Sequence, residues 1–206
     1  MSAGSPSPDS PTAHDSGFAN LIDELRGLLD AACAAAAPAE VNREVSEGVR
    51  RLCSLLRPHA VPGDTAPAGQ RPDLPGEGHP LRPPTIITAS SHDKVQAEIE
   101  FSRAHVGSGD TVHGGLLPLV FDDVLGRLAA RATPLLARTA YLRVDYRAVT
   151  PIGRPLRVEG GIEKFEGRKI LTWGRMTDGD TELTTAQALF VIARPVAHSR
   201  SSSGRG

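Results

Sequence analysis

Four closely spaced segments in the C-terminal half of this 206-residue chain alternate apolar and polar side chains, and they constrain its fold more than any other feature. They cover residues 139–149, 156–165, 169–177 and 183–193. Such alternation is typical of β-strands that bury one face. The segments are separated by the turn-forming stretches Pro151-Ile152-Gly153, Glu166-Gly167 and Asp178-Gly179-Asp180. Because turns this short join antiparallel neighbours, the sequence predicts an antiparallel sheet.

One long helical pattern, over about residues 113–131, comes before these strands, and an earlier strand pattern covers residues 94–101. One helix with one antiparallel sheet predicts an α+β fold in which the sheet buries one face against the helix and wraps around it. In the early strand we expect one buried face made of Val95, Ala97, Ile99 and Phe101. In the strand after the helix we expect inward-facing Leu142, Val144, Tyr146 and Ala148, and outward-facing Arg143, Asp145 and Arg147.

Composition divides the rest of the chain into further segments. Residues 1–16, rich in Ser and Pro, and residues 195–206 are expected to be disordered tails. Residues 17–57 carry two amphipathic helical patterns, which predict a helical hairpin. Residues 58–84 hold eight of the chain's seventeen prolines and four of its glycines, which predicts a semi-stiff linker. The α+β domain is therefore expected to span residues 85–194.

Charge and composition exclude several classes of function. The chain has 23 Lys and Arg against 24 Asp and Glu, whereas proteins that bind nucleic acid or membrane surfaces have a basic excess. It has no apolar run of about 18 residues that could cross a membrane and no N-terminal signal pattern, so we expect a cytoplasmic protein. Cys33 and Cys53 are too few for a disulfide scaffold and have no histidine at zinc-ligand spacing, so no metal site is expected.

The segment most informative about chemistry runs from Val112 to Asp123 and reads VHGGLLPLVFDD. Gly114 and Gly115 open the predicted helix and allow a ligand to approach the backbone N–H groups closely. These N–H groups and the positive end of the helix dipole suit a carbonyl oxygen that becomes negative during a reaction. About two turns later, Asp122 and Asp123 lie in an apolar run, where a carboxylate is costly unless it is exposed, paired or used.

This motif, His113-Gly-Gly with Asp122 nine residues after the histidine, resembles that of hotdog-fold acyl-CoA thioesterases of the phenylacetate-pathway type. The resemblance covers roughly residues 85–194 and includes the strand patterns at 139–146 and 186–193. It implies a hotdog fold, in which an antiparallel sheet wraps around a long central helix, and assembly into homodimers or homotetramers. It also implies hydrolysis of an acyl-CoA thioester, with coenzyme A as part of the substrate and no further cofactor.

The resemblance also implies roles for individual residues. Asp122 would be the catalytic carboxylate, acting as a nucleophile or as a base for a water molecule. Gly114 would donate its backbone N–H to the thioester carbonyl, with His113 beside it and Gly115 leaving room for the substrate. Thr139 of the neighbouring subunit would help to position the water. Each residue also has a plainer interpretation: a surface carboxylate paired with an arginine for Asp122, a helix cap for His113 and an ordinary strand residue for Thr139.

Basic side chains are concentrated after the motif. Between residues 124 and 177 there are eleven Lys and Arg against four Asp and Glu. Solvated strand faces account for such an excess, but a basic rim would also suit the phosphates of coenzyme A. Arg154, Arg157 and Arg168 are the candidates for that contact. The lone tryptophan, Trp173, is expected to pack in the sheet rather than to bind a ligand.

Two other functions use the same fold. A non-catalytic acyl-CoA sensor, such as a regulator with an N-terminal DNA-binding unit, would need a basic helical hairpin, but residues 15–57 carry seven acids and five bases. A hydratase would need its own Asp/His pair, for which the sequence has no good candidate. Two points stay open: which acyl group is cleaved, from coenzyme A or a carrier protein, and whether the hairpin covers the site or extends a dimer interface.

Overall fold

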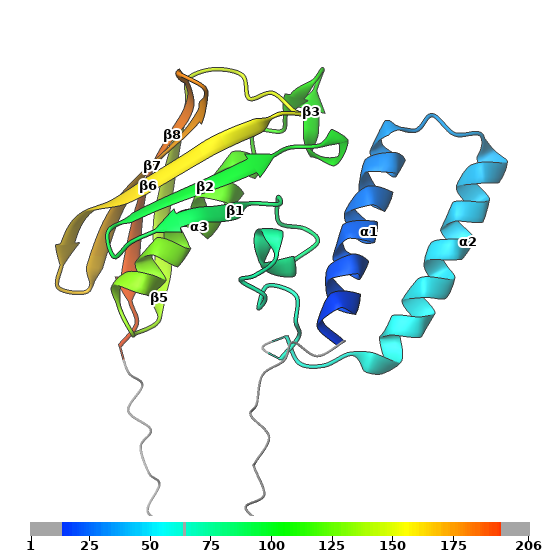
Figure 1. Cartoon of the computed structure of the whole chain (residues 1–206), viewed down its shortest axis with the longest axis horizontal. Coiled ribbons are helices and arrows are strands. Elements are labelled where there is room, and N and C mark those ends of the chain that lie inside the picture. Colours follow the sequence, from blue (N-terminus) through cyan, green and yellow to red (C-terminus); the bar gives the residue numbers. More distant parts are fainter. Residues whose placement is uncertain (1–13, 64, 195–206) are drawn as a thin grey trace, which may run out of the picture. The chain divides into compact units, whose positions relative to one another are not determined.

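A computed structural model of the protein describes residues 14–63 and 65–194 (Figure 1). The described chain divides into two compact units. The first contains the residues up to Ile86 together with Glu98–Leu116 and Thr150–Pro155, and the second contains Ile87–Ala97, Leu117–Val149 and the residues from Leu156 on. The tails predicted at 1–16 and 195–206 lie outside the described residues, except for residues 14–16, which belong to the first helix.

A six-stranded sheet dominates the second unit, with the strand order β1-β2-β6-β7-β8-β5 (Figure 1). Its strands are β1 (Ile86–Ser90), β2 (Lys94–Glu100), β5 (Ala137–Tyr146), β6 (Pro155–Glu166), β7 (Lys169–Asp178) and β8 (Thr181–Ile192). The pairs β6–β7, β7–β8 and β5–β8 are antiparallel. The predicted α+β fold with an antiparallel sheet is therefore confirmed.

Helix α3 (Leu116–Ala132) packs on this sheet through a face of buried side chains at helical spacing. These side chains are Leu117, Val120, Phe121, Val124, Leu125, Leu128 and Ala129. Two glycines of the sheet allow the helix to come close. A Cβ at Gly160 would lie 2.5 Å from the side chain of Leu125, and a Cβ at Gly174 would lie 2.9 Å from the ring of Phe121.

Burial along the strands follows the predicted alternation for most positions. Val95, Ala97, Ile99 and Phe101 are buried as predicted. On β5, Leu142 and Val144 are half-buried, but the prediction that Tyr146 and Ala148 face inward is wrong, since Tyr146 is 56% exposed and Ala148 is exposed. Strand β5 lies at the edge of the sheet and ends at Tyr146, so the alternation does not continue past that residue.

The first unit begins with the predicted helical hairpin, α1 (His14–Ala34) and α2 (Ala39–Leu56), with Pro38 as the residue before α2. Residues 58–84, predicted as a linker, form turns and a short 3₁₀ helix, η2 (Pro75–Gly78). Arg26 on α1 donates hydrogen bonds to the carbonyl oxygens of Pro75 (2.9 Å) and His79 (3.3 Å). Part of the proline-rich segment is therefore tied to α1.

The segment from Glu98 to Leu116, which includes the end of β2, completes this unit. It contains a 3₁₀ helix, η3 (Arg103–His105), and a small two-stranded sheet of β3 (Val106–Ser108) and β4 (Thr111–Val112). Helix α1 contacts η3, and the carboxylate of Asp30 accepts a hydrogen bond from the N–H of Ala104 (2.7 Å). Residues 150–155 bind to the same segment, since Val112 N–H donates to Thr150 O (2.9 Å) and Gly153 N–H donates to Phe101 O (2.7 Å).

Candidate active site

His113 caps the start of helix α3. Its carbonyl oxygen accepts the N–H of Leu116 (2.9 Å) and its Nδ1 accepts the N–H of Gly115 (3.1 Å). These bonds satisfy two N–H groups that have no acceptor within the helix. The capping interpretation of His113 therefore describes its local structure. Because Nδ1 accepts a hydrogen bond, a neutral imidazole holds its proton on Nε2, which is then a donor on this exposed side chain.

Two glycines shape the surroundings of His113. A Cβ at Gly107 would lie 2.7 Å from the Cα of His113, so the preceding loop can pass this close only with glycine there. A Cβ at Gly115 would lie 3.2 Å from the imidazole Nδ1. The backbone N–H of His113 also donates to His105 O (2.8 Å), which fixes the residue to η3. The missing side chain of Gly115 leaves room for the imidazole, while its predicted substrate contact stays a prediction, and Gly107 is a contributor that the motif did not indicate.

Asp122 and Thr139 meet in the second unit. The Thr139 hydroxyl donates a hydrogen bond to Asp122 Oδ1 (2.7 Å), and both side chains are exposed. In the part of the chain that the structure describes, Asp122 Oδ2 has no hydrogen-bond partner. The resemblance implied that Thr139 comes from a neighbouring subunit, whereas the structure joins the two residues within one chain.

A break in the register of β5 accompanies this contact. Thr139 pairs with Phe190 and Tyr141 pairs with Leu189, so one extra residue is inserted on β5 between them. Such a β-bulge redirects the side chains next to it and is frequent beside active sites. Because bulge positions follow no period of two, the alternating pattern does not indicate in which direction the Thr139 side chain points.

Asp123 has a different environment from its neighbour. Its carboxylate forms an ion pair with Arg127 one turn later (2.8 Å), and the two side chains are only 11% and 17% exposed. Adjacent residues of a helix point about 100° apart, so one carboxylate is held in this pair and the other faces outward. The arginine that could have neutralised Asp122 is therefore bound to Asp123.

The structure does not gather the three predicted phosphate-binding arginines into one cluster. Arg157 lies near the start of β6, and Arg168 follows its end, where Nη1 donates to the carbonyl of Ile192 (3.0 Å). At about 3.3 Å per residue, the strand separates them by roughly 30 Å, so they cannot bind the same phosphate group of one molecule. Arg154 precedes β6 and belongs to the first unit.

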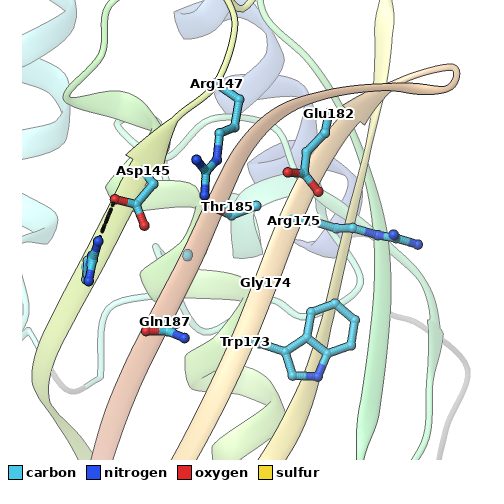
Figure 2. Close-up of a pocket in the computed structure, with 10 residues that line it drawn as sticks. Asp145, Arg147, Trp173, Gly174, Arg175, Glu182, Thr185 and Gln187 are labelled. Atoms are coloured by element: carbon cyan, nitrogen blue, oxygen red, sulfur yellow. Dashed lines mark hydrogen bonds and ion pairs between the residues drawn. The ribbon is translucent and has the colours of Figure 1, made fainter.

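A polar pocket of about 430 Å³ lies on the sheet in the second unit (Figure 2). Trp173, Arg175 and Gln187 line it from β7 and β8, and Arg143 and Asp145 of β5 form an ion pair at its side (3.2 Å). Trp173 is 36% exposed, and its indole packs against Gly161, where a Cβ would lie 2.6 Å from Nε1. The residues lining this pocket do not include Asp122 or Thr139.

Two further properties bear on the class of site. Among the described residues no group of three or more His, Cys, Asp and Glu side chains is arranged to hold a metal ion. None of the described helices combines the length and the apolar character needed to cross a membrane.

Comparison with known proteins relates the chain to thioesterases. Acyl-coenzyme A thioesterase THEM4 from Xenopus laevis is 34% identical over 87 residues, which are 40% of this chain and 38% of that relative. The chain thus spans less than half the length of this curated relative. No protein-family model matches the sequence.

Solved structures extend the similarity to the fold. The crystal structure of a thioesterase superfamily protein superposes with a TM-score of 0.73 and 27% identity, over 88% of this chain and 97% of that chain. A protein from Streptococcus mutans bound to acetyl-CoA has a TM-score of 0.51 and 14% identity, over 53% of this chain and 88% of that one. The predicted fold is therefore confirmed.

Proposed function

Because this chain is a hotdog-fold protein of the thioesterase superfamily, we propose that it hydrolyses an acyl-CoA thioester to a free acid and coenzyme A. The observation that carries the proposal is the exposed carboxylate of Asp122, with one oxygen held by Thr139 and the other open to a water or a substrate. The acetyl-CoA bound to the Streptococcus mutans protein is consistent with this class of ligand. The phenylacetate-pathway subtype stays a prediction.

Asp122 can act in two ways. As a general base it takes a proton from water, the hydroxide attacks the carbonyl carbon, and collapse of the tetrahedral intermediate breaks the C–S bond, with the proton passing to the thiolate. As a nucleophile its carboxylate attacks the carbonyl carbon, the thiolate leaves, and water then hydrolyses the mixed anhydride. Since Thr139 binds Oδ1, we assign the proton transfer or the attack to Oδ2.

The developing negative charge on the thioester oxygen needs hydrogen-bond donors. We propose two, the backbone N–H of Gly114, which the resemblance implies, and the Nε2–H of His113, which follows from the tautomer that its Nδ1 contact requires. The N–H of Gly115 already donates to His113. Gly115 is therefore expected to contribute by its lack of a side chain rather than as a donor.

We further propose that the active form is a homodimer or a dimer of dimers. Strand β5 pairs only with β8 among the described residues, and its ten residues contain no proline. An open edge of this kind readily pairs with another strand. Asp122 and Thr139 are exposed on the single chain, so a second copy at this edge would shield the thioester from bulk water.

Replacement of Asp122 tests the function directly. Asp122→Asn is expected to lower turnover of acyl-CoA at least about 100-fold, because the amide cannot accept a proton or attack the thioester. The assay follows release of the coenzyme A thiol over aromatic, medium-chain and long-chain substrates. Glu163→Gln, at an exposed carboxylate on β6, is the matched control and should keep full activity.

Unchanged turnover in Asp122→Asn contradicts the proposed mechanism. Tight binding of acyl-CoA by the wild-type chain without any release of thiol would contradict hydrolysis and favour the non-catalytic sensor.

A further inference from the structure

Helix α2 carries a stripe of apolar side chains that nothing in the described chain covers. The stripe consists of Val41, Val45, Val49, Leu52, Leu55 and Leu56, and these residues are between 37% and 68% exposed. No residue of α2 is buried. At 100° per residue the six side chains fall within a sector of about 120°, which is typical of a helix that packs on a partner. An apolar stripe of this size is costly to leave in water.

The charged residues beside the stripe indicate what the partner is. At 100° per residue, Glu44 and Arg51 both fall on the edge of the stripe next to Leu55, whereas the opposite edge carries the uncharged Asn42 and Cys53. Glu44 and Arg51 are two turns apart, and neither forms an ion pair within the described chain. One edge of the stripe therefore holds an acid and a base that have no charged partner of their own.

Such an arrangement is self-complementary in one orientation. When two identical helices pack antiparallel about a two-fold axis, the same edge of each stripe lies side by side and the chain directions are opposed. Glu44 then faces Arg51 of the second copy, and Arg51 faces Glu44 of the second copy. In a parallel pair the charged edge would meet the uncharged one, and neither ion pair would form.

Gly48 marks the centre of this pairing. It lies inside the stripe, midway between Val41 and Leu55, and the space where its Cβ would be is met only by the guanidinium end of Arg51 at 3.7 Å. Since the separation of packed helices depends on the side chains at the contact, a glycine at the crossing point allows close approach. We propose that α2 packs antiparallel against α2 of a second copy of this chain, with the two-fold axis near Gly48.

Disulfide trapping tests the geometry in the full chain. In a Cys33→Ser/Cys53→Ser background, which removes two exposed thiols, Gly48→Cys places one thiol beside the two-fold axis. We expect this variant to form a covalent dimer under mild oxidation at micromolar concentration. Arg50→Cys, two residues away and on the opposite face of α2 at 100° per residue, is the matched control and should form little. Equal trapping of both variants, or of neither, overturns the proposal.

Charge reversal provides an independent test in the Gly48→Cys background. Glu44→Arg alone and Arg51→Glu alone each place like charges across the pair and should slow trapping about tenfold. The combination of Glu44→Arg with Arg51→Glu restores opposite charges and should restore the rate. Failure of the double reversal to restore it overturns the antiparallel arrangement.

A different occupant would give a different result. If the stripe instead covers the substrate site of its own chain, Leu52→Glu should raise KM for acyl-CoA without changing disulfide trapping, and this outcome also contradicts the proposal.

Discussion

At the scale of single residues, two adjacent carboxylates have different environments, and we propose a catalytic role for the first and a stabilising role for the second. Thr139 holds the exposed Asp122, and Arg127 holds the largely buried Asp123. The i,i+4 spacing of Asp123 and Arg127 is visible in the sequence. The contact of Asp122 with Thr139 is not, because it depends on a bulge in β5 that shifts the register after Thr139.

The contribution of the Thr139 hydroxyl to activity can be tested separately from that of the branched shape of the side chain. Thr139→Val keeps the branched side chain but removes the donor to Asp122, and we expect kcat to fall about tenfold with little change in KM. Thr139→Ser keeps the hydroxyl and should retain most of the activity. Steady-state kinetics on one acyl-CoA substrate measures both. An equal loss in the two variants would indicate that packing of the methyl group, not the hydrogen bond, matters.

Asp123 should behave in the opposite way to its neighbour. Asp123→Asn removes the negative charge that the largely buried guanidinium of Arg127 contacts, so we expect a loss of stability of about 2 kcal/mol. Urea denaturation followed by circular dichroism measures this change. Asp122→Asn, at an exposed site, should unfold at the same urea concentration as the wild type. A stability loss of similar size in both would contradict the assignment.

At the scale of elements, helix α3 can pack closely on the sheet because Gly160 and Gly174 have no side chains at the contact. Gly174→Val would place atoms against the ring of Phe121, where even a Cβ would be 2.9 Å away, and should destabilise the fold by about 1–3 kcal/mol. Gly126→Ala, within α3, is the control, since its Cβ would meet only Phe190 at 3.7 Å and alanine favours the helix. In thermal unfolding, the Tm of Gly174→Val should therefore fall below that of the wild type, whereas the Tm of Gly126→Ala should not.

The stability of the first unit is expected to depend on pH, because His105 lies in the 3₁₀ helix η3. Burial lowers the pKa of His105 below its ordinary value of 6.5, an effect that the charge of Asp30 partly opposes. Its Nδ1 also accepts the N–H of Ser102 (2.9 Å), which an imidazolium cannot do. Below about pH 6.5 the unfolded chain binds more protons than the folded one, so stability is full above this pH and is lost as the pH falls toward the folded pKa.

Thermal unfolding at about pH 7.5 and about pH 5.5 measures this effect. On acidification, the Tm of the wild type should fall by several degrees more than the Tm of His105→Gln, whose side chain does not titrate. The same loss in both proteins would show that other groups carry the pH dependence.

At the scale of the whole molecule, the α+β fold follows from patterns that are local in the sequence. The strands show period two, α3 shows helical spacing and short turns fix the antiparallel pairing. Contacts between distant segments have no such pattern. Arg26 binds carbonyl oxygens of residues 75 and 79, although the prolines there predict only a linker. Arg157 and Arg168 are likewise named as phosphate-binding candidates from the local excess of basic residues, which does not record that β6 lies between them.

The interleaving of the two units sets the order in which the chain can fold. The N-terminal helices share their unit with residues 150–155, whose hydrogen bonds to Phe101 and Val112 close it. A ribosome must therefore add about a hundred residues after the end of α2 before that unit is complete. During that time the apolar stripe of α2 is present on an incomplete chain. When several ribosomes translate one messenger RNA close together, the stripes of neighbouring nascent chains would meet before the sheet has formed.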